Sequence, residues 1–363
     1  MPGHAQNMPK IGSNFRADGT IASAQAWQAA DMATRHEEWT WQLDAPALRA
    51  LEAAEAQLPK HGELLEYEQA DFPLGDFAPV LAQVRERLLT GSGFAVLKGL
   101  PIEAWGVEKS ARIYWGLGLH LGLAVSQNGK GHALGHVKDL GYDYHHPNSR
   151  GYQTSARLPF HTDYADLVAL MCLRTAKSGG LSSITSSVSV YNEMMRRAPE
   201  LARTLTEPLY RTRWGEVGSD RPAWIEVPAF NVHASGVVTT YVRSSVRKAQ
   251  LMPEVPRVTA QQEEAMDLFD EIAGSDALRL DMEFDDGDIQ ILNNHWILHS
   301  RTAYEDFEEP ERRRHLMRLW LACEDGPPFP PAMSESFYGL TLNGRPNGIH
   351  IPGVPMVAPL EAT

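Results

Sequence analysis

The amino-acid sequence predicts a mainly β protein, a sandwich or jelly roll, with helices that flank the sheets and mostly precede them. Two observations predict this class. After residue 155, short apolar runs of strand length alternate with turns rich in glycine and proline. Before residue 122, apolar residues recur at helical spacing instead. With 363 residues, 43% of them hydrophobic, the chain can bury one large core or two smaller ones.

Helical spacing and end signals predict four helices, at residues 44–58, 77–90, 103–122 and 259–274. The first has Asp44 where a helix cap is expected and Pro46 in its first turn. The fourth can form a capping box between Thr259 and Gln262, and Gly274 suits its end. Between the second and third helices, the stretch "GSGFAVLKGLP" indicates a short apolar strand between a glycine break and a proline stop.

Strand-like runs dominate the second part of the chain. They cover residues 166–173, 181–190, 224–232, 236–242, 278–284, 288–292 and 314–323. The stretch "LRLDMEF" alternates apolar and polar residues, which is typical of a strand with one buried face. Cys172 and Cys323 both lie in apolar runs. Because two cysteines cannot form a disulfide framework, we expect both to be small residues in buried strands.

The charge and the division of the chain set further expectations. We expect a loosely packed polar arm at 1–35 and one domain at 36–363, with a helical part at 36–122, a jelly-roll core at about 90–325 and a C-terminal extension at 326–363. The 33 basic and 46 acidic residues give a net charge of −13, which is not typical of a nucleic-acid-binding protein. The sequence shows no bilayer-spanning apolar run and no signal peptide, so we expect a cytoplasmic protein without membrane partners.

Three His-x-acid triplets occur in the chain, at residues 36–38, 61–63 and 161–163. Side chains two residues apart point to the same side of a strand but not to the same side of a helix. The first two triplets lie in polar surroundings, whereas "HTD" stands directly before the apolar run "LVALMCL". We therefore expect His161 and Asp163 to begin a strand and to point at a common metal ion.

A third ligand is expected from the stretch "GDIQILNNHWILHSRTAYED", which contains His295 and His299. Trp296 follows His295 where a zinc peptidase would have glutamate, so that class is not predicted. A strand that leads into an irregular turn would present one of the two histidines, and we expect His295 to support the site or line the pocket. Two histidines and one carboxylate with open positions suit a non-haem Fe(II) centre.

Two arginines follow this region in "RRRHLMRLWLA". Arg314 and Arg318 are four residues apart, so on a strand they would face the same side. A guanidinium binds a carboxylate through two parallel hydrogen bonds, which a carboxylate-bearing co-substrate requires. Two other interpretations stay open, a metal-binding cupin-like module without redox chemistry and a zinc hydrolase that uses the same three ligands. Neither of them needs a carboxylate-binding arginine.

The order "HTD … GG-S … NN-(3 residues)-HSR … R-HLM-R-LWL" resembles the taurine dioxygenase family, with its clavaminate synthase-like members, over about residues 70–325. This resemblance implies a double-stranded β-helix and an Fe(II)- and 2-oxoglutarate-dependent dioxygenase. Such an enzyme uses O2 to oxidise an unactivated C–H bond and releases succinate and CO2. Hydroxylation is the expected outcome, with desaturation or ring closure as variants. The substrate would be a small molecule.

The resemblance also implies roles for individual residues. The implied iron ligands are His161, Asp163 and His299. Arg314 would bind the distal carboxylate of 2-oxoglutarate, and Arg318 would lie near the co-substrate or an anionic group of the substrate. Ser182 stands where the family has a threonine that contacts 2-oxoglutarate, which is a departure from the pattern.

Residues that flank the implied ligands are candidates for the substrate pocket. They are Tyr164, Asn294, Trp296 and Arg301, together with Gln127 and Asn128 from a segment that the family places near substrate. An arginine-lined pocket in an acidic chain favours an anionic or amino-acid-like substrate. Members of the family often self-associate, so a homo-oligomer is a further expectation.

Overall fold

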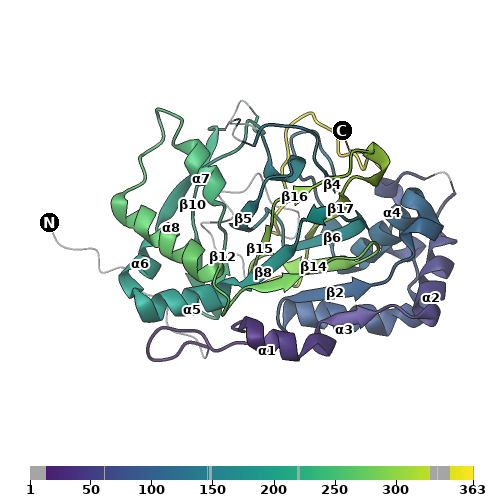
Figure 1. The fold of residues 1–363 in the computed structure, drawn as a ribbon, viewed down its shortest axis with the longest axis horizontal. Coiled ribbons are helices and arrows are strands. Elements are labelled where there is room, and N and C mark those ends of the chain that lie inside the picture. The colour runs from purple at the N-terminus through teal and green to yellow at the C-terminus, as the bar shows by residue number, and fades with distance from the viewer. Residues whose placement is uncertain are drawn as a thin grey trace.

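A computed structural model describes residues 14–60, 62–144, 146, 149–218, 221–327, 333 and 344–362. Two β-sheets form the jelly-roll core (Figure 1). The larger sheet has the order β1 (Thr40–Gln42), β2 (Phe94–Lys98), β14 (Ile289–Asn293), β6 (Leu167–Arg174), β17 (His315–Ala322) and β3 (Leu123–Ala124), and β4 (Leu134–Val137) also pairs with β17. The smaller sheet has the order β13 (Leu280–Met282), β8 (Ser182–Ser186), β15 (Ile297–Arg301) and β5 (Leu158–His161). The expected mainly β fold is confirmed.

Shorter elements complete the architecture. Three two-stranded ribbons pair β9 (Pro208–Thr212) with β10 (Trp224–Pro228), β11 (Phe230–His233) with β12 (Gly236–Thr239), and β7 (Ser178–Gly179) with β16 (Tyr304–Glu305). Short 3-10 helices lie at His36–Glu38, Leu64–Glu66, Gln69–Asp71, Gly75–Phe77, Gly151–Gln153 and Pro310–Arg312. Cys172 lies in β6, Cys323 directly follows β17, and both thiols are buried as expected.

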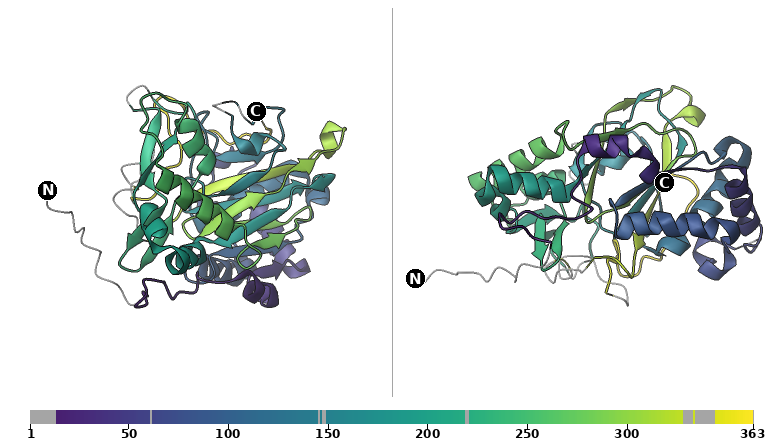
Figure 2. Two further views of the ribbon diagram at one scale, coloured as in Figure 1. Left: turned by 60° about the vertical axis from the view of Figure 1, so that its left-hand side comes forward. Right: turned by 90° about the horizontal axis from the view of Figure 1, so that it is seen from below.

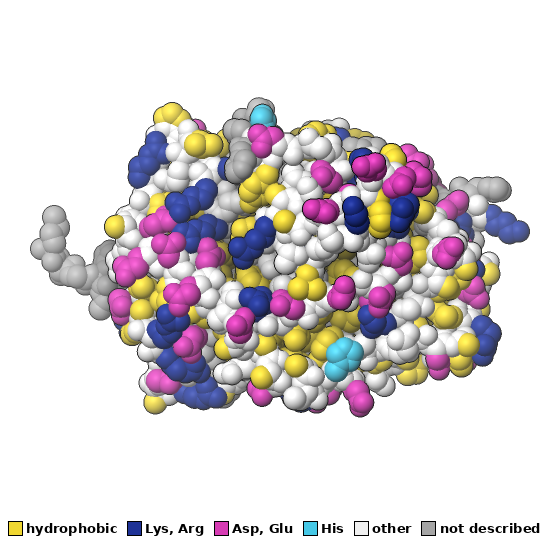
Figure 3. All heavy atoms as spheres, viewed as in Figure 1, with side chains coloured by type: hydrophobic (Ala, Val, Ile, Leu, Met, Phe, Trp, Pro, Cys, Tyr) yellow, Lys and Arg dark blue, Asp and Glu magenta, His cyan; other side chains and the backbone are white. Residues whose placement is uncertain are grey.

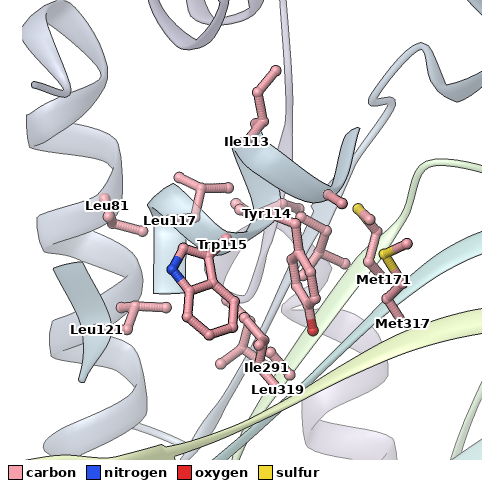
Figure 4. Packing of buried hydrophobic residues seen from close by; sticks show 14 of the residues in the cluster. Leu81, Ile113, Tyr114, Trp115, Leu117, Leu121, Met171, Ile291, Met317 and Leu319 are labelled. Atoms are coloured by element: carbon pink, nitrogen blue, oxygen red, sulfur yellow. The ribbon is translucent and has the colours of Figure 1, made fainter. Parts of the chain in front are cut away.

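Three helices cover the outer face of the larger sheet, namely α2 (Ala45–Glu55), α3 (Ala78–Leu89) and α4 (Ile102–Leu121). Figure 4 shows Tyr114 and Trp115 of α4 close to Met171, Met317 and Leu319 of the sheet. Each fully buried apolar side chain of this kind contributes roughly 1.5–3 kcal/mol to folding. The predicted helices at 44–58, 77–90 and 103–122 are confirmed, and the Asp44 side chain caps α2 as expected.

A second group of helices packs at the opposite end of the molecule, as Figures 1 and 2 show. The group consists of α5 (Ser187–Arg197), α6 (Pro199–Thr204) and α8 (Ala260–Ala273), and α7 (Arg243–Ala249) packs on β9. Its core contains Phe230 and Phe269, with ring centroids 5.5 Å apart. The predicted capping box between Thr259 and Gln262 is present at the start of α8.

The strand predicted at 181–190 is wrong beyond Ser186, where α5 begins. The alternation of Val188 and Val190 with serines imitates a strand, but the Ser186 side chain accepts a hydrogen bond from the Ser189 amide and starts a helix. Tertiary packing overrides local preference here, because Val188, Val190 and Met194 are buried in the second core. The run at 224–232 is likewise two strands, β10 and β11, rather than one.

The expectation of a loosely packed N-terminal arm is wrong for its described part, residues 14–35. Ile21, Trp27 and Met32 are buried, and α1 spans Ala29–Thr34. The Trp27 indole donates a hydrogen bond to the Ser92 carbonyl at 2.9 Å. The Asn192 side chain bonds both the amide and the carbonyl of Ile21, at 2.7 and 2.8 Å. Residues 1–13 lie outside the described part of the chain.

The C-terminal extension has a defined place where it is described, at residues 344–362. Its backbone pairs with the segment before β4. The Ile349 amide donates to the Ser126 carbonyl at 2.8 Å, and the Ala133 amide donates to the Val357 carbonyl at 2.8 Å. The extension is therefore attached to the larger sheet. Among the helices of the described residues, none combines the length and apolar character needed to cross a bilayer.

Two buried histidines join the C-terminal extension to β4 and β17. His136 Nε2 donates to the Pro359 carbonyl at 2.9 Å, so its Nδ1 accepts from His315 Nε2, 2.8 Å away. Arg174 donates to His315 Nδ1 at 3.3 Å. Burial lowers the pKa of His136, and burial followed by the His136 charge lowers the pKa of His315 to about 3. Both rings are neutral in the folded protein, since a further proton would break this chain of hydrogen bonds.

We expect this pair to make stability depend on pH. The unfolded histidines take up protons below about pH 6.5, whereas folded His315 does so only near pH 3. Because the pKa of His315 is lower in the folded state, its contribution to stability is fully present above about pH 6.5. This contribution is lost progressively as the pH falls toward 3. His315 alone should lower the free energy of unfolding by about 2 kcal/mol at about pH 5. The free energy of unfolding, measured with urea, should decrease between neutral pH and about pH 5 in both proteins. The decrease should be smaller in His315→Gln than in the wild type by that amount.

The control for this measurement is His36→Gln, because His36 is exposed. This variant should retain the pH dependence of the wild type. An unchanged pH dependence in His315→Gln would contradict the prediction.

Candidate active site

His161 and His299 lie opposite each other on neighbouring strands of the smaller sheet. His161 ends β5, His299 lies in the middle of β15, and their Cα atoms are register partners. Their ring centroids are 4.2 Å apart. The expectation that "HTD" begins a strand is wrong, because the motif ends β5 and enters the connection to β6. His299 likewise lies within a strand, and the irregular turn at 293–296 precedes it.

Asp163 lies in the connection after β5, where Asn294 fixes its backbone. The Asn294 side chain accepts from the Asp163 amide at 2.7 Å and donates to the Asp163 and Ala165 carbonyls at 2.7 and 2.9 Å. The Asp163 carboxylate accepts from the Trp320 indole at 2.8 Å and from Arg318 at 3.2 Å. These contacts turn the carboxylate toward the two histidines, and its Oδ2 is 3.8 Å from His299 Nε2.

These three side chains can hold a metal ion, since one ligand atom from each lies within 4.8 Å of the others. The Nδ1 atom of His161 donates to the Pro159 carbonyl at 2.8 Å, which leaves Nε2 with a lone pair. Burial lowers the pKa of both histidines, that of His299 to about 3. Burial opposes ionisation of Asp163, but the adjacent Arg318 charge holds its pKa below the ordinary value. The donor set is thus two neutral imidazoles and a carboxylate, which fits Fe(II).

Of the other two triplets, only the first is fully described. His36–Glu38 forms an exposed 3-10 turn. His61 lies outside the described residues.

A cavity opens above the three side chains, between the two sheets and the segment at 149–152. Apart from Asp163, the charged residues among its described lining are basic: Arg150, Lys248, Arg301, Arg314 and Arg318. Aromatic side chains also line it, namely Tyr144, Tyr152, Tyr164, Trp214 and Phe284. The cavity therefore combines one corner that can bind a metal with a lining in which basic and aromatic side chains contact one another.

Arg314 lies directly before β17 and is 4% exposed, and its Nη1 atom has no hydrogen-bond partner among the described residues. The backbone of Gly180 makes room for it. A Cβ atom at Gly180 would lie 3.0 Å from Arg314 Nε, and Gly180 has a φ of +74°, which favours glycine. Ser182 also lines the cavity, and its hydroxyl donates to Gln290 at 3.2 Å. Gly180 of the sequence motif "GG-S" thus lies against the arginine that was expected to bind a carboxylate, and Ser182 of the motif lines the same cavity.

Arg318 lies on β17 beside Asp163 and is held on several sides. Its Nε donates to Gln127 Oε1 at 2.7 Å, and the Gln127 amide donates to the Ala133 and Arg318 carbonyls at 3.0 and 2.7 Å. The guanidinium carbon is 4.7 Å from the Tyr152 ring centroid and 4.9 Å from that of Trp320. Arg318 therefore presents a fixed positive charge at the metal-binding corner.

Two of the six candidates for the substrate pocket line the cavity, Tyr164 and Arg301. The placement of the other four differs from the prediction. Asn294 orients the connection between β5 and β6, which carries Asp163. Gln127 and Asn128 line a smaller neighbouring pocket beside Arg318. The Trp296 side chain packs into the two hydrophobic cores near α5 and β13. Neighbours of a ligand in sequence point away from it when the backbone turns, as it does at 293–296.

A buried charged network lies behind the ligand loop. Asp166 bonds His295 Nε2 at 2.6 Å and accepts from Arg345 Nε at 2.9 Å, and it also contacts Arg345 Nη2. The Asp166 carbonyl accepts from the Asn294 amide at 2.9 Å. From the sequence we expected a supporting role for His295, but we did not predict the supporting roles of Asp166, Trp320 and Arg345. Long-range contacts define these three roles, and no local motif marks them.

The sequence matches the family described as "Taurine catabolism dioxygenase TauD, TfdA family" over residues 55–320. A protein described as FR-33289 synthase, from Streptomyces rubellomurinus, is 32% identical over 334 residues, which cover 90% of this chain and 97% of that protein. A "Taurine hydroxylase-like protein SAT17" from Stachybotrys chartarum is 30% identical over 68% of this chain and 66% of its own.

Solved structures share the fold. Asparagine oxygenase, solved with Fe(II), 3-hydroxyasparagine and succinate, has a TM-score of 0.62 at 18% identity and covers 78% of this chain and 93% of its own. The oxygenase OrfP, solved with Fe and alpha-ketoglutaric acid, has a TM-score of 0.55 at 17% identity with the same coverage. The family match covers the HTD triplet, the GG turn, Arg314 and Arg318. The chain belongs to the TauD/TfdA family of Fe(II)- and 2-oxoglutarate-dependent dioxygenases.

Proposed function

We propose that this dioxygenase hydroxylates a small anionic or amino-acid-like molecule at the metal-binding corner of the cavity. The proposed iron ligands are His161, Asp163 and His299. Arg314 binds the distal carboxylate of 2-oxoglutarate, and Ser182 of the same cavity also contacts this co-substrate. The observation that carries this assignment is the single cavity that joins three convergent ligand side chains to a buried arginine with an unbonded nitrogen.

Bound Fe(II) supplies the chemistry of this family, in which O2 and the decarboxylation of 2-oxoglutarate to succinate and CO2 oxidise a C–H bond of the substrate. The residues of this chain bind and orient the reactants. Neutral histidines and an ionised Asp163 are the ligand forms that a metal needs, and the surroundings favour both. The buried rings of Tyr164 and Trp320 lie at this corner and limit the access of water.

The basic lining supports an anionic substrate. Arg318 donates through Nε to Gln127 and through Nη1 to Asp163. These two bonds fix its positive charge beside the metal-binding corner. An anionic group that binds there would place its neighbouring C–H bonds close to the metal. Two of the structural neighbours bind hydroxylated amino acids, 3-hydroxyasparagine and (3S)-hydroxy-L-arginine. Amino acids and their derivatives are therefore the first compounds to test. The cytoplasmic location and the self-association stay predictions.

The proposal predicts that the wild-type protein, loaded with Fe(II), consumes 2-oxoglutarate and O2 and forms succinate. Turnover without substrate should be slow, and a true substrate should accelerate it and gain one oxygen atom. Oxygen uptake, succinate formation and mass spectrometry of a panel of amino acids and small organic acids measure these outcomes. Zn(II)-loaded protein is the control and should form no succinate. Failure to bind 2-oxoglutarate with any metal would contradict the proposal, and hydrolysis by the zinc form would support a zinc hydrolase instead.

A further inference from the structure

Arg301 and Arg314 come from different sheets and share one wall of the cavity. Arg301 ends β15 of the smaller sheet, and Arg314 lies directly before β17 of the larger sheet. Both guanidinium groups face the ring of Tyr304, at 4.7 Å and 5.1 Å from its centroid. Arg301 is 5% exposed and Arg314 is 4% exposed. Two positive charges are therefore buried side by side.

Both guanidinium groups have unused hydrogen-bond donors. The Nε and Nη1 atoms of Arg301 and the Nη1 atom of Arg314 are buried without partners in the described part of the chain. In contrast, Arg301 Nη2 donates to the Thr154 carbonyl at 2.8 Å and also contacts the Ala156 carbonyl. These two contacts involve only Nη2 and leave Nε and Nη1 of the Arg301 guanidinium unbonded. Buried donors in proteins are nearly always bonded, and because both arginines line the cavity, these donors are available to a ligand bound there.

The charges indicate that this ligand is an anion. Within the described residues, neither guanidinium forms an ion pair with a carboxylate. Burial lowers the pKa of the Arg314 guanidinium. The Asp306 carboxylate acts on both arginines from a distance but forms an ion pair with neither. Two like charges in a buried site destabilise each other unless a negative group lies between or directly beside them. The expected 2-oxoglutarate carboxylate at Arg314 is such a group.

We propose that Arg301 is a second binding residue for the distal carboxylate of 2-oxoglutarate, beside Arg314; this inference rests on the proposed function. An ionised carboxylate offers about four lone-pair sites and can accept from two guanidinium groups at once. Arg301 is two residues beyond His299, and side chains two apart on a strand point to the same side. One strand thus supplies a ligand to the metal end of the co-substrate and a donor to its distal end.

A pair of 2-oxo acids can isolate this role. In 2-oxopentanoate, a methyl group replaces the distal carboxylate of 2-oxoglutarate, while the keto acid end is unchanged. Dissociation constants of both compounds are measured by calorimetry, without oxygen, on the Fe(II)-loaded full chain. Arg301→Gln should weaken 2-oxoglutarate about 10- to 100-fold, the size expected for lost charge-assisted hydrogen bonds, and should change 2-oxopentanoate by less than about twofold. Arg301→Lys keeps the charge and should lie between.

Two further variants complete the comparison. Arg314→Gln should show the same selective loss as Arg301→Gln. Arg312→Gln removes a positive charge of the exposed 3-10 turn that precedes β17 and should leave both constants unchanged. Binding of 2-oxopentanoate by each variant also shows that its site is folded.

The possible outcomes distinguish the role of Arg301 from the proposed function. Equal weakening of both 2-oxo acids by Arg301→Gln, or no weakening, would overturn the role of Arg301, because a residue that only holds the 154–156 backbone cannot discriminate between them. In that case wild-type binding of 2-oxoglutarate would still uphold the proposed function. If the wild type binds neither compound, the proposed function fails, and the role of Arg301 fails with it.

Discussion

Asp163→Asn is expected to lower the rate of 2-oxoglutarate-dependent succinate formation by more than about 100-fold, beyond the 10- to 100-fold typical of residues that only support a metal ligand. Asparagine keeps the size of the side chain and an oxygen that can accept from Trp320 and Arg318. It is neutral, however, and amide oxygen is a much poorer ligand for iron than carboxylate. Succinate formation and iron content per chain, measured after gel filtration, test this expectation.

Trp320→Phe is the matched control for this substitution. It removes the indole donor, 2.8 Å from Asp163 Oδ2, but leaves the carboxylate in place. Iron affinity should fall by about 10- to 100-fold, and activity should return at high Fe(II) because the ligand set is intact. Activity of Asp163→Asn should not return at high Fe(II). Full activity and full iron content in Asp163→Asn would contradict the assignment of Asp163 as a ligand.

The sequence alone identified the side chains that converge at the site. His161 and Asp163 belong to one triplet that precedes an apolar run, which is a local signal. His299 lies far along the chain, and the resemblance to the taurine dioxygenase family singled it out from His295. Arg314 and Arg318 were identified because four-residue spacing on a strand gives one face. The capped helices α2 and α8 were predictable for a similar reason, since a cap and a periodic face are both local.

What the sequence could not provide is the way in which distant segments fix these side chains. Asn294 was taken for a pocket residue because it precedes the ligand His299, yet its amide bonds the loop of Asp163. Gln127 was assigned to the substrate and instead holds Arg318, 191 positions away. The strand expected beyond Ser186 failed because burial against the second core decides that conformation. Each of these outcomes depends on contacts that no local pattern contains.

Arg345→Met is expected to lower the free energy of unfolding by about 3–5 kcal/mol, the usual effect of breaking a buried ion pair by removing one partner. Arg345 and the Asp166 carboxylate are both buried, and Arg345 also donates to the Pro327 carbonyl at 2.7 Å. The buried charge of Asp166 would then depend on His295 and on the Cys323 amide, 2.6 and 2.8 Å away. Urea unfolding at neutral pH measures the loss.

A double-mutant cycle separates the ion pair from simple packing. Asp166→Asn combined with Arg345→Met removes both charges, so the double variant should be more stable than the sum of the two single effects predicts. The same network should affect catalysis, because the Asp166 carbonyl accepts from the Asn294 amide and Asn294 holds the Asp163 loop. We expect weaker iron binding in Arg345→Met, even though this residue touches none of the three ligands. Additive losses of stability together with wild-type iron affinity would show that the C-terminal extension only packs against the sheet and does not help to position the metal ligands.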